Sequence, residues 1–172
     1  MRPAPGEVLH FSEDPTIRIF RPHVAKTSMQ ATPYVWAVGH DRAPDYWFPR
    51  QCPRAMAWVG PSTTPADRDR IIGAGSGDRV HAIEYGWLDA IRTVELYAYR
   101  LPADAFEEHD AAMVATTEVR PLGPPERVSD LFALHDEAGI QLRVLNRLHA
   151  FWAETVTSTL EWSGIRLRNA RP

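Results

Sequence analysis

His10 and Ser12, near the start of the chain, form the first pair of side chains whose types and spacing could serve chemistry. They lie two residues apart in a segment that alternates as a strand does, so both side chains should point to the same face. Such a pair can hydrogen-bond to the hydroxyl groups of a ligand, and His10 is also a candidate catalytic residue. The alternative is a buried histidine satisfied by its neighbours, with Ser12 capping the turn that follows.

An aromatic and arginine-rich segment, residues 34–58, holds three Trp, two Tyr, three Arg and the only Cys of the chain. Guanidinium groups beside aromatic rings can bind an anionic, planar ligand through forked hydrogen bonds and stacking. We therefore expect Trp36, Tyr46, Arg50 and Arg54 to bind ligand, since two prolines hold the arginines rigidly. The alternative is that the arginine stems pack over the rings while their charged ends face solvent.

Glu84 is the best candidate for a catalytic carboxylate. It follows Val80 and Ala82 on one face of a predicted strand, and a carboxylate on an inward face is costly unless it has a partner or a function. It could also accept hydrogen bonds from ribose hydroxyls, or pair with one of the many arginines. Cys52 is interpreted as a structural thiol, because no histidine partner that would activate it can be assigned.

Composition excludes several classes of protein. The chain has 172 residues, 44% of them hydrophobic, and a net charge of −3, which argues against a basic nucleic-acid interface. One Cys cannot form an internal disulfide, and the seven scattered His residues lack metal-ligand spacing, so no metal site is predicted. No apolar run approaches the ~20 residues of a membrane helix, and we expect a cytoplasmic protein without a membrane partner.

The pattern of elements predicts one α+β domain over residues 1–172, with a curved, mostly antiparallel sheet and short helices. Strands are expected over residues 7–11, 34–38, 55–59, 80–85, 94–101, 111–122 and 141–145, and short helices lie between them. Residues 149–163 are expected to form a longer C-terminal helix with an apolar stripe. That stripe favours a core face, with self-association through the helix as the alternative.

Three groups of motifs together resemble a bacterial family of unknown function. The residues that carry the resemblance are Leu9-His10-Phe11-Ser12-Glu13-Asp14-Pro15 with Phe20-Arg21-Pro22; Val35-Trp36-Ala37 with Ala43-Pro44, Tyr46, Phe48-Pro49-Arg50 and Cys52-Pro53-Arg54; and Ile83-Glu84 and Trp87 with Leu96-Tyr97, Tyr99 and Leu101-Pro102. The resemblance implies a family-like core over residues 6–145. Residues 146–172 would then be a C-terminal helix and tail outside it.

A fainter similarity is to the ADP-ribosyltransferase-like fold. His10-Phe11-Ser12 is similar to its first strand, residues 34–37 with Ala43 and Tyr46 to its second element, and Glu84 to its later acid. This similarity implies that His10 and Ser12 hold a nicotinamide ribose, that Tyr46 stacks on the nicotinamide ring, and that Glu84 steers the transfer. NAD would be the cofactor only under this interpretation.

The sequence therefore supports three hypotheses. The first is a transferase or hydrolase that acts on a nucleotide-like or other anionic small molecule, with His10 and Glu84 as catalytic residues. The second is a noncatalytic protein that binds a small ligand in the same pocket. The third is a protein-interaction module that uses the C-terminal helix. None of the three names a substrate.

Overall fold

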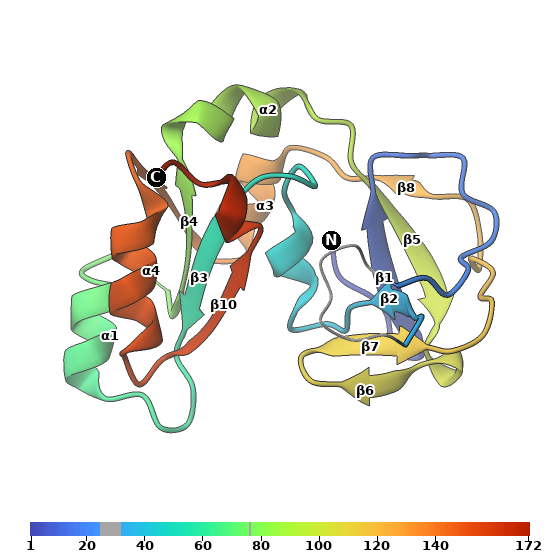
Figure 1. Cartoon of the computed structure of the whole chain (residues 1–172), viewed down its shortest axis with the longest axis horizontal. Helices are drawn as coiled ribbons and strands as arrows, with labels where there is room; N and C mark the ends of the chain where they lie inside the picture. The colour runs from blue at the N-terminus through green and yellow to red at the C-terminus, as the bar shows by residue number, and fades with distance from the viewer. Residues whose placement is uncertain (25–31, 76) are drawn as a thin grey trace. The chain divides into compact units, whose positions relative to one another are not determined.

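The computed structural model of the chain describes residues 1–24, 32–75 and 77–172 (Figure 1). Its helices and mostly antiparallel sheets confirm the α+β class. Internal contacts group the chain into two compact units, each built from two stretches of sequence. Unit 1 comprises residues 1–47 and 95–129, and unit 2 comprises residues 48–94 and 130–172. The expectation of one domain over residues 1–172 stays a prediction.

Unit 1 holds two antiparallel three-stranded sheets. The first has the order β1-β5-β8 and the second the order β2-β7-β6. The strands are β1 (Glu7–Ser12), β2 (Val35–Ala37), β5 (Tyr97–Pro102), β6 (Glu107–His109), β7 (Ala112–Ala115) and β8 (Glu126–Arg127), with the 3-10 turns η1 (Ala43–Tyr46) and η3 (Ala103–Ala105). In β1 the side chain of Val8 enters a core that also contains Phe20, Tyr99 and Leu101, and Leu9, on the opposite face of the strand, is buried as well.

Unit 2 is built on one four-stranded sheet in the order β10-β3-β4-β9. Only the pairing of β9 with β4 is parallel. The strands are β3 (Arg54–Trp58), β4 (Arg79–Glu84), β9 (Gln141–Leu145) and β10 (Glu161–Ile165). The helices are α1 (Pro65–Ile71), α2 (Leu88–Thr93), α3 (Leu131–Glu137) and α4 (Leu148–Val156), with the 3-10 turns η2 (Tyr85–Trp87) and η4 (Leu167–Asn169).

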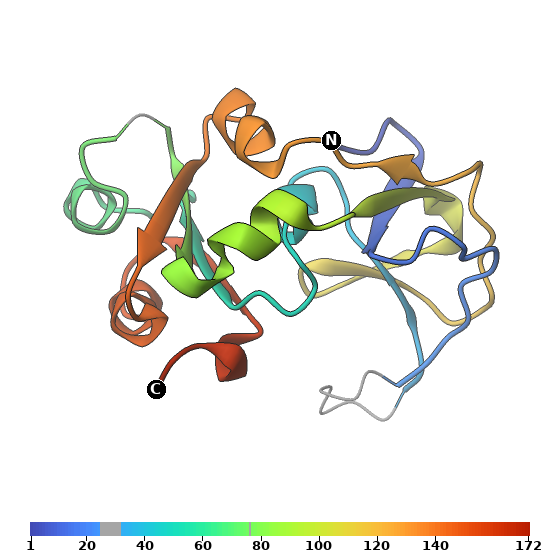
Figure 2. The ribbon, with the colours of Figure 1, turned by 90° about the horizontal axis from the view of Figure 1, so that it is seen from above.

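The two faces of this sheet carry different residues. On one face Ala57 and Val80 pack with Ile71 of α1, and Ala82 packs with Leu148 of α4. On the opposite face His81 of β4 contacts His135 of α3. Helices α1 and α4 therefore cover one side of the sheet and α3 the other (Figure 2).

The expected C-terminal helix over residues 149–163 is wrong in its second half. Helix α4 ends at Val156, and residues 161–165 form β10, an edge strand paired with β3. The cause is local, because the Ser158 N–H and hydroxyl both donate to the carbonyl of Thr155 and close the last turn. One of the short helices expected between strands, over residues 42–48, is also too long. Only the four-residue turn η1 forms there, with Pro44 inside it and Pro49 after it.

Gly77 occupies a position that only glycine tolerates. Its φ is +90°, and a Cβ at this position would collide with the carbonyl oxygen of Gly139. Gly77→Ala should therefore lower the free energy of unfolding by about 1–3 kcal/mol, measured by urea denaturation. Gly123→Ala is the matched control, because a Cβ there meets open space, and a change within about 0.5 kcal/mol is expected. Equal stability of the two variants would contradict this role for Gly77.

Candidate functional site

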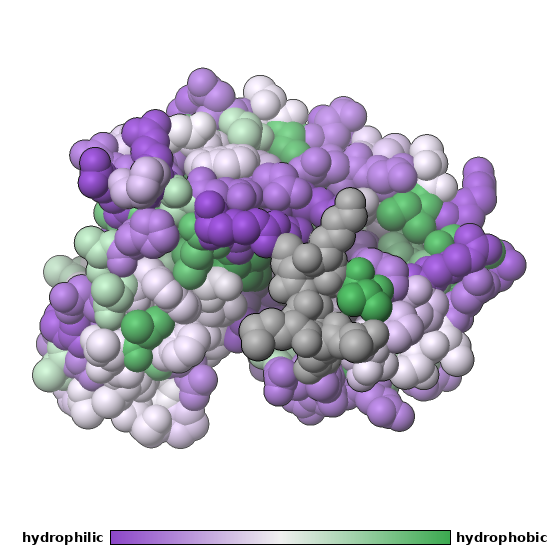
Figure 3. All heavy atoms as spheres, in the orientation of Figure 1, coloured by the Kyte–Doolittle hydropathy of each residue, from purple (hydrophilic) through white to green (hydrophobic). Residues whose placement is uncertain are grey.

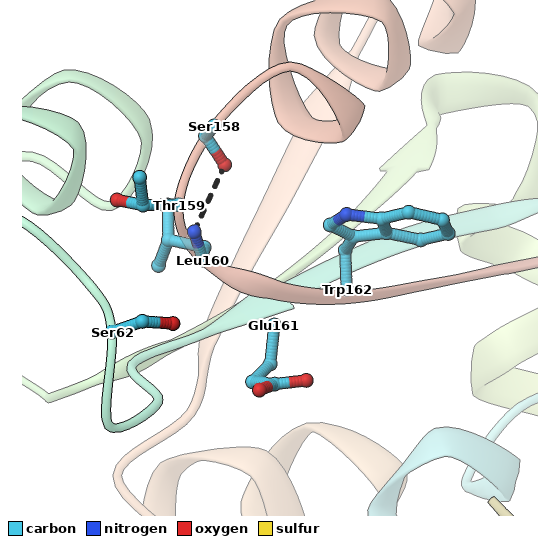
Figure 4. Close-up of a pocket in the computed structure, with 6 residues that line it drawn as sticks. All are labelled: Ser62, Ser158, Thr159, Leu160, Glu161 and Trp162. Atoms are coloured by element: carbon cyan, nitrogen blue, oxygen red, sulfur yellow. Dashed lines mark hydrogen bonds between the residues drawn. The ribbon is translucent and has the colours of Figure 1, made fainter.

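A pocket of about 450 Å³ lies in unit 2 where two loops meet (Figure 4). One loop follows β3 and contributes Ser62. The other connects α4 to β10 and contributes Ser158, Thr159 and Leu160, and the first residues of β10, Glu161 and Trp162, complete the lining. Its volume falls in the range typical of small-molecule sites.

Helix caps shape the loop after β3. Thr64 is the N-cap of α1 and accepts a hydrogen bond from the Asp67 N–H at 3.2 Å, and Pro65 follows at the first helical position. This is the expected chemistry of a helix start. The Thr63 hydroxyl accepts from the Gly60 N–H at 2.8 Å and donates to the carbonyl of Thr159 at 3.1 Å. This hydrogen bond connects the loop after β3 to the loop between α4 and β10, and these two loops form the walls of the pocket.

Asp67 joins the two walls. One of its carboxylate oxygens accepts from both the N–H and the hydroxyl of Thr159, each at 2.8 Å. Arg70 binds the other oxygen at 2.8 Å. Hydrogen bonds from Arg70, and then from Thr159, lower the pKa of Asp67 to about 2, so the carboxylate remains charged and keeps the loops together at neutral pH.

Two lining groups remain open to a ligand. Within the described part of the chain, neither the Ser62 hydroxyl nor the Glu161 carboxylate has a hydrogen-bond or ion-pair partner. The hydroxyls of Ser158 and Thr159 already donate within the protein, to Thr155 and Asp67. Figure 4 shows Ser62 and Glu161 on one side of the β10 ribbon and the Trp162 ring on the other.

The expected residues of unit 1 do not form one site around β1. His10 is half-buried, with its Nδ1 2.7 Å from the carbonyl oxygen of Trp36 and its ring on Phe20. The buried Ser12 hydroxyl accepts from the Asp14 N–H at 3.1 Å, which is the turn-capping alternative. Tyr46 stacks on Phe11 at 6.4 Å. Because successive strand residues face opposite ways, Tyr46 lies on the other face of β1 from His10 and Ser12.

Trp36 belongs to an aromatic cluster of unit 1. Its ring lies 5.7 Å from that of Tyr34 and 6.4 Å from that of His109, both in edge-to-face contact. Within the described residues its buried indole N–H has no hydrogen-bond partner. Trp36 and His10 are thus brought together through the Trp36 carbonyl, while the Trp36 ring packs elsewhere.

The two expected arginines of unit 2 differ in their surroundings. Arg54 is 2% exposed, donates to the carbonyl of Cys52 at 2.9 Å, and lies over the ring of Phe48 at 5.1 Å. This agrees with the packing of arginine on an aromatic ring in the predicted alternative, but the charged end is buried rather than facing solvent. Arg50 is exposed, and its carbonyl accepts from Arg166. Cys52 is buried, and burial raises the pKa of its thiol to about 12, which suits a structural thiol.

Glu84 is 1% exposed, and its carboxylate is bound by backbone amides. One oxygen accepts from the N–H of Leu148, the first residue of α4, at 3.0 Å, and both oxygens accept from the N–H of Arg171 at 3.1 and 3.2 Å. Arg147, the N-cap of α4, supplies no side-chain cap. Glu84 therefore caps this helix from β4, where a negative charge also suits the helix dipole.

Glu84→Gln should destabilise the protein. The amide NH2 group would face backbone donors and leave a buried N–H without an acceptor, at a cost of about 1–3 kcal/mol. Urea denaturation should show this loss, with Glu137→Gln on the exposed end of α3 as the matched control. Unchanged stability of Glu84→Gln would rule out the capping role.

Two buried histidines form a hydrogen-bonded chain across unit 2. Arg79 Nε donates to His81 Nε2 at 2.9 Å, which places the His81 proton on Nδ1. That nitrogen lies 3.1 Å from His135 Nε2, and His135 Nδ1 lies 2.6 Å from the carbonyl oxygen of Leu131. The chain is satisfied when both imidazoles are neutral. Burial lowers the pKa of His135 to about 4, and the charge of Arg79 acts in the same direction.

Because the pKa of His135 is lowered on folding, the free energy of unfolding should decrease in acid. The pKa of His135 is about 4 in the folded protein and 6.5 for the ordinary group, so the unfolded chain binds the extra proton first as the pH falls. The contribution of neutral His135 to the free energy of unfolding is fully present above pH 6.5 and is lost as the pH falls through about 4. It amounts to about 3 kcal/mol. Urea denaturation across this pH range should show that the free energy of unfolding changes less with pH in His135→Asn than in the wild type. The Asn side chain keeps a donor for the carbonyl of Leu131. An unchanged slope would contradict the assignment.

Neither a metal centre nor a membrane span emerges from the residues described. Within residues 1–24, 32–75 and 77–172, no group of three His, Cys, Asp or Glu side chains is placed to hold a metal ion. No helix in these ranges combines the length and apolar character needed to cross a membrane.

Fold and site together define an α+β protein with a hydroxyl-lined pocket in one of its two units. The chain belongs to a family of unknown function (DUF6886), whose model matches residues 9–170. This confirms the family resemblance but corrects its extent, because residues 146–170 are part of the family rather than an extension beyond it. No curated protein and no solved structure matches the chain, and nothing supports the similarity to ADP-ribosyltransferases.

Sequence reasoning did not select any residue that lines this pocket. The caps at Thr64 and Ser158 carry a local signal, since Ser and Thr before a proline or after a helix mark its ends. No local signal marks Ser62 or Glu161. They meet because β3 and β10, distant in sequence, pair with Glu161 opposite Trp58.

Proposed function

We propose that this protein is a noncatalytic binding protein for a small, hydroxylated molecule that is neutral or positively charged. Among the lining residues, Glu161 is the only ionisable one, and the described residues offer its carboxylate no partner. That open carboxylate beside the Ser62 hydroxyl is the observation that carries the proposal. A carboxylate accepts hydrogen bonds only, so it selects ligands that bring hydroxyl or ammonium donors.

Charge sets the preference of this pocket against anions. A phosphate or carboxylate ligand would meet the negative charge of Glu161 without a lining cation to offset it, and like charges at close range repel. The ligand class proposed here therefore differs from the anionic, nucleotide-like substrate that the arginines suggest in the sequence. Those arginines, Arg50 and Arg54, are not part of the pocket lining.

The state of the other candidate groups supports binding without catalysis. Glu84 accepts backbone hydrogen bonds with both oxygens, the thiol of Cys52 stays protonated at neutral pH, and His135 is held neutral by burial. General acid–base catalysis needs a group whose pKa lies near the working pH and whose proton can reach a substrate. Glu161 serves as an acceptor that orients a ligand.

Isothermal titration calorimetry tests the proposal with three groups of probes: inositol and glucose, glucosamine and spermidine, and ATP, NAD and ADP-ribose. Binding is expected for the hydroxylated neutral or cationic probes and not for the three anions. Glu161→Gln should weaken binding of glucosamine about tenfold or more, since hydrogen bonds to a charged group contribute about 1.5–3 kcal/mol. Ser62→Ala should have a smaller effect.

Glu137→Gln removes an equivalent charge from the exposed end of α3 and serves as the control, with unchanged affinity expected. Tighter binding of NAD or ADP-ribose than of any neutral or cationic probe would overturn the proposal. So would an affinity that Glu161→Gln leaves unchanged.

A further inference from the structure

Strand β10 forms one edge of the sheet of unit 2, with β3 on its only paired side. Glu161, Trp162 and Gly164 are exposed, and Trp162 retains 46% of its accessible surface. The face of the molecule seen in Figure 3 carries hydrophobic residues only as separate small groups. An exposed strand edge with a large aromatic side chain therefore stands out as an interaction feature.

The hydrogen-bonding direction of β10 follows from the neighbouring strand pair. The N–H of Val59 donates to the carbonyl of Asp78 at 2.8 Å, which makes this position a hydrogen-bonded pair between the chain segments of β3 and β4. Antiparallel pairs alternate, so Trp58 and Met56 turn their backbone groups toward β10, where they face Glu161 and Ser163. The backbone groups of Trp162 and Gly164 consequently point outward.

These outward groups have no hydrogen-bond partner among the residues that the structure describes. The strand also lacks the usual protection of an edge, because it contains neither Pro nor Lys and has one charged residue, Glu161, at its first position. Natural proteins usually protect such edges with charge, proline or a covering segment. The unprotected edge is suited to pairing with another strand.

We propose that β10 pairs antiparallel with β10 of a second copy of this chain, centred on Ser163. In this register Trp162 of each copy faces Gly164 of the other, and these are the residues whose N–H and C=O groups point outward. All of those groups are then used in hydrogen bonds between the copies. A register centred on Trp162 or on Gly164 would leave some of them unpaired.

Side chains fit this register. A Cβ at Gly164 would collide with the Leu167 side chain and the Trp152 ring, so both side chains lie directly over this position. Trp162 already meets Trp152 edge-to-face at 5.3 Å. Pairing would bring Trp162 of each copy against Trp152 of the other and bury the exposed part of Trp162, which adds aromatic contacts between the copies.

Charge is also complementary in this arrangement. Glu161 begins β10 and Arg166 follows its last residue, so antiparallel pairing places Glu161 opposite Ile165, the residue next to Arg166 of the second copy, twice. Arg166 keeps its hydrogen bond to the carbonyl of Arg50. No like charges face each other across the centre. A second copy is therefore favoured over a foreign strand, because the symmetric register uses every outward-pointing backbone group of β10 and places no like charges opposite each other.

Charge substitution at the centre of the interface tests the proposal. Ser163 faces Ser163 of the second copy, so Ser163→Glu or Ser163→Lys alone places like charges directly opposite each other. Sedimentation equilibrium from micromolar to millimolar concentration should show a monomer–dimer equilibrium for the wild type. Each variant should dimerise at least about tenfold more weakly, and an equimolar mixture of the two should recover the association.

Circular dichroism and thermal unfolding establish that both variants fold. A wild type that stays monomeric over the whole concentration range overturns the proposal. A mixture of the two folded variants that associates no better than either one alone also overturns it. Both proposals involve Glu161 and Trp162, so ligand affinity is measured at concentrations where the chain is monomeric, and failure of one test then leaves the other intact.

Disulfide trapping gives an independent reading of the register. Ser163→Cys should form a covalent dimer under mild oxidation, because residues opposed in a non-hydrogen-bonded pair lie about 4.5 Å apart at Cα. The native Cys52 is buried and should not react. Ala153→Cys on the exposed side of α4 is the control for random collisions, and equal cross-linking of the two variants would contradict the proposed pairing.

Discussion

The carboxylate of Glu84 organises unit 2 by holding backbone amides from two other segments. It lies at the end of β4 and accepts from the first residue of α4 and from Arg171. A buried carboxylate is tolerated because its charge is met by these donors. By fixing the start of α4 against the sheet, it positions that helix and hence the loop that connects it to β10. The pocket depends on that loop.

The hydrogen bonds of the polar side chains in this unit are the basis for proposing a binding site rather than a catalytic one. Hydrogen bonds of Asp67 and Thr63 join the two loops, and that of Ser158 closes the end of α4. His81 and His135 bond to each other, and His135 also bonds to the backbone. Rigid walls of this kind orient a ligand at low entropic cost. What remains for a ligand is a hydroxyl at Ser62 and a negative charge at Glu161, and this pair favours hydrogen-bond donors over anions.

Local patterns in the sequence predicted much of the fold. The period of two in residues 7–11 predicted the strand β1, and the strands expected over residues 55–59, 80–85 and 141–145 form as β3, β4 and β9. The helix over residues 149–163 was extended too far because Leu160 continues the apolar stripe of Leu148 and Trp152, although it packs with α1 residues from the end of a turn. Such an ending is set by hydroxyl groups at Ser158, which a hydrophobic period does not register.

The candidate site was far less predictable, for a physical reason. Reactive residue types such as His10, Glu84 and Arg54 attract attention in a sequence, yet in the structure each one bonds to a backbone group. Whether a side chain serves the backbone or a ligand depends on partners from distant segments. The pocket itself arises from the pairing of β10 with β3.

The most direct measurement is a ¹⁵N chemical-shift titration of the whole protein with glucosamine and, separately, with ADP-ribose. The account predicts shifts confined to Ser62 and residues 158–162 with glucosamine, and none with ADP-ribose. Shifts at His10, Trp36 and Tyr46 with ADP-ribose, and none around Glu161 with glucosamine, would contradict it.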